Sequence, residues 1–483
     1  MVGQSLGRTT PINRQAIVII HGIGEQRPLG TLKSFVRSFR GASTFYSKPE
    51  RMTSSFEARR IKLRRLDDGT DWIETDFYEY YWAHLMFGER WRHLLRWART
   101  RIGRLFFTAD EPTPPPFGER QSGNVEFPPH PQLQSLRRRL IAVAIGITTV
   151  ALVSVALFGI AAIFVTLLVV LALVVAGQWM SESSALSVIG DVSRYLDVSP
   201  VNIGKRHDIL QGGIDLLSAL HAERSDLDAS LSVTPPTSIA TPPPPYVYDR
   251  IVVVGHSLGS VIGYEIIKHY WARVNRYLAF DEHSIPESVT ELEAAAAASE
   301  KDTDAFQDRQ FAVWCDLGRS QDMKPQPPGV QAAPRWLITD FVTMGSPLTY
   351  APVLMAECAK DFNERAVLRE LPLCPPNRSV RDRPNGFAVH LRFEAAVNDN
   401  DPTLILHHAA PFAATRWTNF FFRDDPIGGP LANVFGYGVK DVAVDPRLFT
   451  LLRRRGTDFS ADFTSTRVTG RPLRITSPSS SPY

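Results

Sequence analysis

The sequence predicts an α/β fold, in which a mostly parallel sheet carries helices on both faces and is interrupted by an inserted two-helix transmembrane hairpin. Three observations lead to this prediction. Short apolar runs rich in β-branched residues alternate with helical patterns, as in parallel sheets that are buried on both faces. One such run leads directly into a Gly-x-Ser-x-Gly turn. A block of 38 residues, from Leu140 to Gly177, contains no charge and no proline.

The predicted strands are apolar and are bounded by turn residues. The first, residues 15–20, is followed at once by His21-Gly22-Ile23-Gly24. Aromatic residues indicate a second strand over residues 73–82. Residues 276–333, which are acidic and alanine-rich and then proline-rich, predict a surface insertion. Further strands are expected at 248–254, 336–344, 387–393 and 416–422, and helices at 185–222, split near Pro200, and at 258–272.

The uncharged block predicts two membrane spans. A spanning helix needs about 20 apolar residues, and one straight helix of this length would reach about 57 Å, against a bilayer core of about 30 Å. Two spans with a turn near Phe158-Gly159 fit better. The alternative is a buried hydrophobic hairpin of a soluble protein. Strands on either side of the block can share a sheet only on one side of the membrane, so the number of crossings is expected to be even.

Basic residues surround the block. Arg137-Arg138-Arg139 precedes it and Lys205-Arg206 follows it, which favours the cytoplasmic side for the remaining chain. Residues 87–107 predict a basic amphipathic helix whose arginines would meet anionic lipid headgroups; the alternative is an ordinary surface helix packed on the sheet. We therefore expect an integral membrane protein with two spans and with membrane lipids as partners.

The hairpin is expected to be inserted within one α/β domain. Its N-terminal part carries the basic helix, and a proline-rich linker leads into the hairpin. The tail is rich in Arg, Ser, Thr, Gly and Pro, a composition that predicts a disordered or altered end. The divisions are 1–110 for the first part of the domain, 111–136 for the linker, 137–180 for the hairpin, 181–452 for the rest of the domain and 453–483 for the tail.

Composition excludes several classes of protein. Lys and Arg number 53 against 50 Asp and Glu, a net charge of +3, which indicates no nucleic-acid surface. The three cysteines, Cys315, Cys358 and Cys374, form no CxxC pair, so neither a disulfide framework nor a metal site is expected and a reducing compartment fits. Residues 1–14 are polar, and we expect no cleavable signal peptide.

The run from Ile251 to Gly259 predicts a strand, a sharp turn and a helix; we call its last five residues, 255–259, the elbow. The turn leaves little room beside its central residue, so glycines occupy positions 255 and 259. It would lift the Ser257 hydroxyl above the sheet, where the Leu258 N–H and the helix N-terminus stabilise a developing oxyanion. We predict Ser257 as a nucleophile; the alternative is a non-catalytic Gly-Ser turn.

On these motifs the sequence resembles the α/β-hydrolase superfamily, in its lipase and esterase branch, over roughly residues 14–85 and 185–435. Within that branch it is similar to bacterial membrane-associated hydrolase-like proteins of unassigned substrate. The resemblance implies that the loop after the first strand, with Gly22 and Gly24, supplies a second oxyanion donor from Ile23 or an adjacent glycine. It also implies that His21 orients this loop and that His256, with Gly255 and Gly259, supports the elbow.

The resemblance further implies an acid at Asp425, in a loop where Asp precedes Pro, with Asp424 as the neighbouring candidate. This carboxylate would orient a catalytic imidazole; the alternative is an aspartate that caps a turn. Ser346, in Gly345-Ser346-Pro347-Leu348, resembles a residue of the strand-end turn found in lipases and is expected to be a turn residue rather than a second nucleophile.

The sequence departs from the family because no histidine follows Asp425, whereas the usual order is Ser, acid, His. Three explanations remain open. The C-terminal part from Arg453 is altered, or His407 or His408 serves out of order, or the protein is a hydrolase-like scaffold without turnover.

The resemblance leads us to expect a membrane-anchored serine hydrolase of lipase or esterase type that cleaves a carboxylic ester of an apolar acyl or lipid substrate, with no metal and no cofactor. The alternative is a catalytically inactive membrane protein of the same fold that acts as a scaffold or binding module.

Overall fold

The computed structural model describes residues 14–22, 47–49, 59–67, 71–86, 200–222, 248–322 and 335–444 apart from short gaps, together with isolated positions that include Leu32, Val36, Tyr195 and several between 138 and 156. Every structural statement below concerns these residues. The predicted basic helix (87–107), the linker, most of the hairpin and the tail lie outside them, as do Ile23, Gly24 and Asp424.

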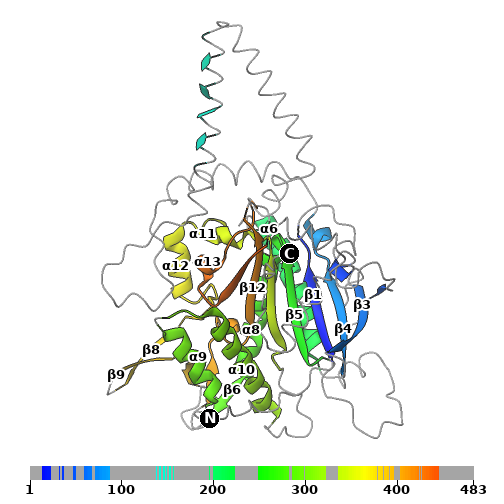
Figure 1. The fold of residues 1–483 in the computed structure, drawn as a ribbon, viewed down its shortest axis with the longest axis vertical. Helices are drawn as coiled ribbons and strands as arrows, with labels where there is room; N and C mark the ends of the chain where they lie inside the picture. Colours follow the sequence, from blue (N-terminus) through cyan, green and yellow to red (C-terminus); the bar gives the residue numbers. More distant parts are fainter. Residues whose placement is uncertain are drawn as a thin grey trace, which may run out of the picture.

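Eight strands form one sheet in the order β13-β12-β7-β5-β1-β4-β3-β2 (Figure 1). The six from β13 to β4 run parallel, while β3 and β2 add to one edge in antiparallel fashion. The mostly parallel sheet is therefore confirmed. The strands are β1 (Arg14–Ile20), β2 (Ser47–Pro49), β3 (Arg59–Asp67), β4 (Asp71–Tyr80), β5 (Arg250–His256), β7 (Ile338–Met344), β12 (Arg416–Phe422) and β13 (Val439–Val444).

Helices and two small sheets complete the described chain. The helices are α6 (Pro200–His221), α8 (Leu258–Val274), α9 (Glu287–Ala297), α10 (Thr303–Asp322), α11 (Ala351–Leu354), α12 (Ala359–Val367) and α13 (Ala432–Phe435), with short 3-10 turns η1 (Ala83–Met86), η3 (Asn275–Tyr277), η4 (Pro347–Tyr350) and η5 (Pro411–Ala413). The small sheets contain β6 (Ala279–Asp281), β10 (Arg392–Ala395) and β11 (Thr403–Leu406), and β8 (Ser379–Arg383) and β9 (Gly386–His390).

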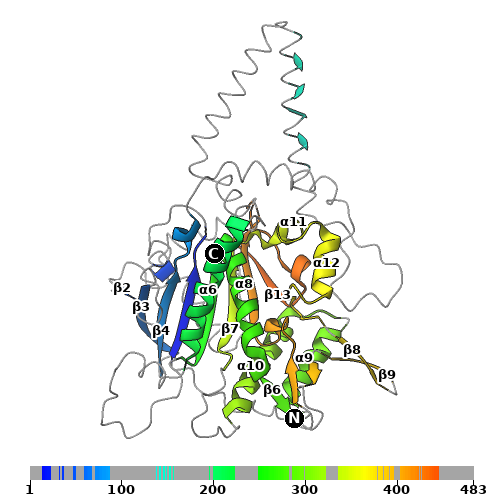
Figure 2. The same cartoon turned by 180° about the vertical axis from the view of Figure 1, so that it is seen from behind.

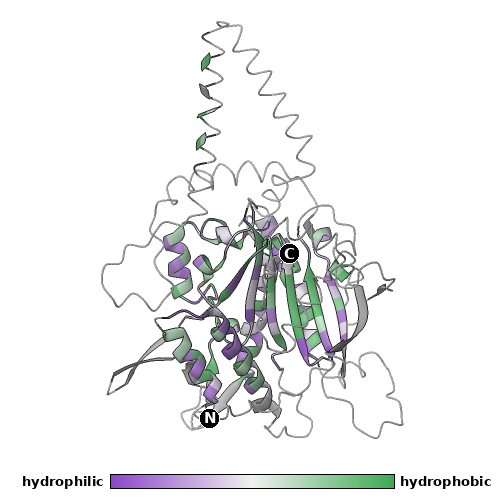
Figure 3. Cartoon of the chain, in the orientation of Figure 1, coloured by the Kyte–Doolittle hydropathy of each residue, from purple (hydrophilic) through white to green (hydrophobic). Residues whose placement is uncertain are grey.

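The alternation of side chains along β1 divides the core between the two faces of the sheet. Ala16, Val18 and Ile20 join the larger core, which packs under α6, α8 and α10 (Figure 2). Ile17 and Ile19 point to the opposite face. There they meet helical residues Leu32, Phe35 and Val36. Hydrophobic residues concentrate in these central strands (Figure 3), as a strand buried on both faces requires.

Two predictions about elements are wrong, and two strands of the main sheet were not predicted. Residues 387–393 do not add a strand to the main sheet but contribute to the two small sheets. Residues 276–333 are not a surface insertion, because Phe306, Val313 and Leu317 of α10 are buried in the larger core. The outer strands β3, next to the edge strand β2, and β13, at the other edge, were not predicted, since they mix apolar and charged residues, a pattern that suits the partly solvated outer part of a sheet.

The strands before and after the uncharged block pair directly. β1 and β5 are parallel neighbours in continuous register from Gln15–Arg250 to Ile20–Gly255. The expectation that they share one sheet is confirmed, and it is the premise of an even number of membrane crossings.

No helix within the described residues is long and apolar enough to cross a membrane, and the predicted hairpin lies mostly outside them. The positions described between 138 and 156 are helical and exposed, with Ile145 and Leu152 at 61% and 65% exposure. The Thr149 hydroxyl donates to the Ile145 carbonyl at 2.8 Å. These positions project away from the sheet (Figure 1).

The projecting positions lie beyond the carboxyl ends of the parallel strands. α11, which follows the end of β7, lies at that end of the molecule, whereas β6, which follows α8 on its return, lies at the opposite end in both views (Figures 1 and 2). The carboxyl ends of the parallel strands, where the elbow lies, therefore face the exposed apolar helix positions.

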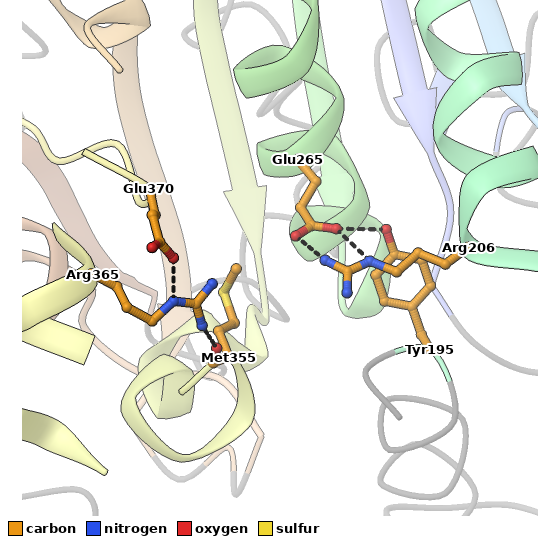
Figure 4. A network of polar contacts seen from close by, with 6 residues as sticks. All are labelled: Tyr195, Arg206, Glu265, Met355, Arg365 and Glu370. Carbon is orange, nitrogen blue, oxygen red and sulfur yellow. Dashed lines mark hydrogen bonds and ion pairs between the residues drawn. The ribbon is translucent and has the colours of Figure 1, made fainter. Parts of the chain in front are cut away.

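An ion pair between the half-buried Arg206 and the buried Glu265 joins α6 to α8 (Figure 4). Arg206 donates from Nε to Glu265 Oε2 at 3.0 Å and from Nη2 to Oε1, and the Tyr195 hydroxyl also donates to Oε2 at 3.0 Å. Glu265 is buried. Arg206, which we counted with the basic flank of the membrane block, is instead neutralised inside the protein and does not support the predicted orientation.

We expect Arg206→Met to lower the free energy of unfolding by about 3 kcal/mol, because it leaves the Glu265 carboxylate buried with the Tyr195 hydroxyl alone. Arg365→Met is a matched control, since Arg365 pairs with the exposed Glu370 (Figure 4) and such pairs contribute about 1 kcal/mol or less. Denaturant titration measures both. The double variant Arg206→Met/Glu265→Leu should recover most of the loss; equal effects of the two single variants would contradict the prediction.

Candidate active site

The elbow holds a non-glycine residue in a strained conformation. Ser257 has φ 50° and ψ −127°, a region that side chains rarely adopt and that is found mainly at functional sites. Its N–H donates to the Met344 carbonyl of β7 at 2.9 Å, and its carbonyl accepts from the Ser260 N–H at 3.0 Å. The neighbouring strand and the first turn of α8 therefore fix both ends of the turn.

The flanking glycines allow this turn to close. A methyl group at position 255 would lie 2.5 Å from Ser260 Cα, and one at position 259 would lie 2.1 Å from the Ile20 carbonyl oxygen and 2.5 Å from that of His21. Both distances are far below van der Waals contact. The predicted reason for these glycines, the lack of space beside the central serine, is confirmed, and the start of α8 lies directly against the end of β1.

The Ser257 hydroxyl makes no structural hydrogen bond within the described residues. Ser257 is 8% exposed, and within the described residues its buried Oγ makes no hydrogen bond. Buried polar atoms in proteins nearly always have a partner, so an unpartnered one needs an explanation. Leu258 begins α8, and its N–H is one of the donors that a helix leaves unused at its N-terminus. The structure thus brings the predicted nucleophile and oxyanion donor together.

The loop after β1 reaches the elbow. A methyl group on Gly22 would lie 2.8 Å from Ser257 Cβ and 3.2 Å from the His256 carbonyl oxygen. The first half of the predicted oxyanion loop therefore touches the serine; Ile23 and Gly24 lie outside the described residues. Only a residue without a side chain allows this approach.

His21 has a structural position, as expected. Its Nδ1–H donates to the Gly22 carbonyl at 2.7 Å, its ring stacks on Trp82 with centroids 5.2 Å apart, and Trp82 Nε1 donates to the His21 carbonyl at 3.0 Å. Burial lowers the pKa of His21 to about 4. The ring is neutral at pH 7 and holds the loop in place.

Asp425 lies at the same edge of the sheet. Its Oδ1 accepts from the Ile427 N–H at 2.9 Å, so one oxygen does cap its own turn. Its Oδ2 faces the end of β7, because a methyl group on Gly345 would lie 3.3 Å from it and one on Gly428 2.7 Å. Desolvation by surrounding protein lowers the pKa of the exposed His256, and the Asp425 carboxylate opposes this shift. Asp425 thus acts electrostatically on the residue next to Ser257.

His407 and His408 do not reach this site. His407 donates from Nε2 to the Asn377 carbonyl at 2.9 Å and accepts at Nδ1 from the Ala409 N–H at 3.1 Å, and burial lowers its pKa to about 3. Its carbonyl accepts from Trp271 Nε1, near the far end of α8 and about 20 Å along the helix from Leu258. His408 lies beside His407, with ring centroids 6.1 Å apart. The structure therefore brings neither candidate for an out-of-order base to Ser257, and no described histidine hydrogen-bonds Ser257.

A polar network that the sequence did not predict fastens the loop after Asp425. Asn419 donates from Nδ2 to the Gly429 carbonyl at 2.9 Å and to Asp441 Oδ1 at 2.7 Å, and accepts at Oδ1 from the Thr343 hydroxyl at 3.0 Å. The Asp441 carboxylate accepts from the backbone N–H groups of Leu431 and Ala432. The one local signal was an asparagine between the apolar residues Trp417 and Phe420 of β12, where a buried polar group requires a hydrogen-bond partner.

The topology places these residues where the strand order of the sheet reverses. From β1 the sheet continues to β4 on one side and to β5 and β7 on the other. Ligands of parallel sheets bind at the carboxyl ends of strands where the order reverses in this way. His21 and Gly22 follow β1 and Ser257 follows β5, so the elbow lies at the reversal. Within the described residues, no cluster of His, Cys, Asp or Glu is arranged to hold a metal ion.

Comparison with known proteins adds no further assignment. A scan against family models, a search of curated proteins and a search of solved structures each found no match for this chain. The function is therefore argued from the geometry of the site.

Proposed function

We propose that the chain is a membrane-anchored serine hydrolase of the α/β-hydrolase fold, which cleaves a carboxylic ester at Ser257. The observation that supports this proposal best is the strained serine at the end of β5, whose buried hydroxyl has no partner within the described residues. Strain of this kind persists only where the surrounding structure enforces it, and Gly22, Gly255 and Gly259 together enforce it here.

In the proposed reaction the Ser257 oxygen attacks the acyl carbon and its proton passes to a base. The Leu258 N–H and a donor from the loop after Gly22, expected at Ile23, hold the oxyanion. The alcohol leaves with a proton, and water then releases the acid from the acyl-enzyme. Asp425 would orient an imidazole.

The membrane part of the proposal is a two-helix hairpin at 137–180 with the hydrolase domain on the cytoplasmic side. Two features support it: β1 and β5 pair across the block, and the carboxyl ends of the parallel strands, where the elbow lies, face the exposed Ile141, Ile145, Leu152 and Val153 (Figure 1). A site that faces the bilayer suits an apolar acyl or lipid ester. Reporter fusions at both termini and within residues 225–245 should all report one side; a split result would overturn the hairpin.

A second candidate is a catalytically inactive protein of the same fold that binds a partner. The observation that favours it is that His407, a candidate for the catalytic base, makes its hydrogen bonds away from Ser257.

A fluorophosphonate probe separates the two candidates. We expect the full chain in membranes to be labelled and Ser257→Ala not to be labelled. Because Ser257 Oγ has no hydrogen bond within the described residues, Ser257→Ala should keep the melting temperature unchanged, and Ser257→Gly should raise the stability by about 1 kcal/mol by relieving the positive φ. A folded wild-type chain without Ser257-dependent labelling would overturn the enzyme in favour of the binding module.

A further inference from the structure

We infer that Ser260 and Ser346 are positioning residues that orient the oxyanion donor of Leu258, an inference that rests on the proposed hydrolase function. Both serines are completely buried, one in the first turn of α8 and the other in the turn after β7. Neither is expected to touch the substrate.

The two hydroxyls form a directed chain of hydrogen bonds. The Leu348 N–H donates to Ser346 Oγ at 3.2 Å, Ser346 Oγ and Ser260 Oγ are 2.7 Å apart, and the Ser260 hydroxyl donates to the Ser257 carbonyl. A hydroxyl has one proton. The Ser260 hydroxyl lies within donating distance of both Ser346 Oγ and the Ser257 carbonyl oxygen, and the carbonyl can only accept. Both contacts are hydrogen bonds when Ser260 donates to the carbonyl and Ser346 donates to Ser260. The chain therefore runs in one direction and ends on the backbone of the nucleophile, and each bond polarises the next.

The end of this chain sets the direction of the oxyanion donor. The Ser257 carbonyl and the Leu258 N–H belong to the same planar peptide group and point in opposite directions. Fixing the carbonyl therefore fixes the N–H. The Ser260 N–H also donates to this carbonyl, at 3.0 Å. Without the Ser260 hydroxyl that single bond is left to hold the peptide against the strained ψ of −127° at Ser257, and a partial rotation would turn the Leu258 N–H away from the oxyanion.

The turn at Gly345 and Ser346 also lies against the predicted acid, Asp425. Ser346 follows Gly345, which has φ +54° and lies against Asp425 Oδ2. Serine at 346 thus connects the turn under the acid to the turn of the nucleophile. A role limited to capping η4 would need only the bond from the Leu348 N–H, not the bond to Ser260.

The inference predicts that Ser260→Ala and Ser346→Ala each slow reaction with the fluorophosphonate, and lower kcat on p-nitrophenyl butyrate, by about 10- to 100-fold with KM unchanged, as expected for a misplaced oxyanion donor. The double variant should be no slower than the slower single variant, because one chain is broken either way. The full-length protein in detergent is used throughout.

Thr415→Val is the matched control. The Thr415 hydroxyl accepts from Trp336 Nε1 at 3.0 Å and donates to the Ile338 carbonyl at 2.8 Å, a similar buried relay at the opposite end of β7. It should lower the melting temperature as the serine variants do, and leave the labelling rate unchanged. Serine variants that label at the wild-type rate would overturn this inference alone, whereas a wild-type chain without Ser257-dependent labelling would overturn the proposed function and this inference together.

Discussion

Gly259→Ala is expected to lower the free energy of unfolding by more than about 4 kcal/mol, a loss seen only where a substitution forces the core apart. The new methyl group would lie 2.1 Å from the Ile20 carbonyl oxygen and 2.5 Å from that of His21. Both obstacles are backbone atoms of β1, which is hydrogen-bonded between β4 and β5 and cannot rotate out of the way. Relief requires α8 to move away from the sheet, and α8 buries 13 of its residues.

Gly204→Ala is the control for this substitution. Gly204 is an exposed residue inside α6, and a methyl group there meets nothing within 4 Å. Alanine should therefore stabilise the helix by about 0.5–1 kcal/mol. Denaturant titration followed by tryptophan fluorescence gives both values. A folded Gly259→Ala chain of nearly wild-type stability would show that α8 does not approach β1 as closely as described.

The sequence predicts the centre of this fold better than its edges. β1 and β5 each contain a continuous apolar run, because strands that are buried on both faces have few polar positions. β7 departs from this pattern with the buried Asp340, which pairs with Arg416 of β12. The outer strands β3 and β13 mix apolar and charged residues, a pattern shared with surface loops. α10 was misjudged because its mean composition is polar, while the residues that decide its position, Phe306, Val313 and Leu317, form one buried stripe.

The same distinction applies to the candidate site. Ser257 and the flanking glycines could be predicted because the turn imposes its steric requirement on adjacent residues. Asn419 with Asp441, and Ser260 with Ser346, could not be predicted, since these bonds join residues that are 22 and 86 positions apart. Such pairs leave no local pattern and follow only from the order of the strands. His407 is the reverse case. Its place in the sequence made it a candidate for the catalytic base, but its ring is held by hydrogen bonds to backbone groups of Asn377 and Ala409, near the far end of α8.

Three buried histidines should make the protein unusually sensitive to mild acid. Burial lowers the pKa of His21 and of His221 to about 4 and that of His407 to about 3, against about 6.5 in the unfolded chain. Between these pH values the unfolded state binds protons that the folded state does not. The three histidines therefore cost no free energy of unfolding well above pH 6.5, and the free energy of unfolding falls as the pH is lowered towards 4. At pH 5 each histidine accounts for a loss of about 2 kcal/mol, and the three together for about 6 kcal/mol.

The slope of stability against pH tests this expectation, because it counts protons directly. Between pH 6 and pH 5 the free energy of unfolding should fall by nearly 1.4 kcal/mol per pH unit for each of the three histidines, about 4 kcal/mol in all. In His221→Gln the amide can accept from the Leu337 N–H and donate to the Leu217 carbonyl, as His221 does, without titrating. Whatever the substitution does to absolute stability, its slope should be smaller by about 1.4 kcal/mol per pH unit. An unchanged slope would mean that His221 becomes protonated within the folded protein, and that its contacts with α6 and β7 survive a positive charge.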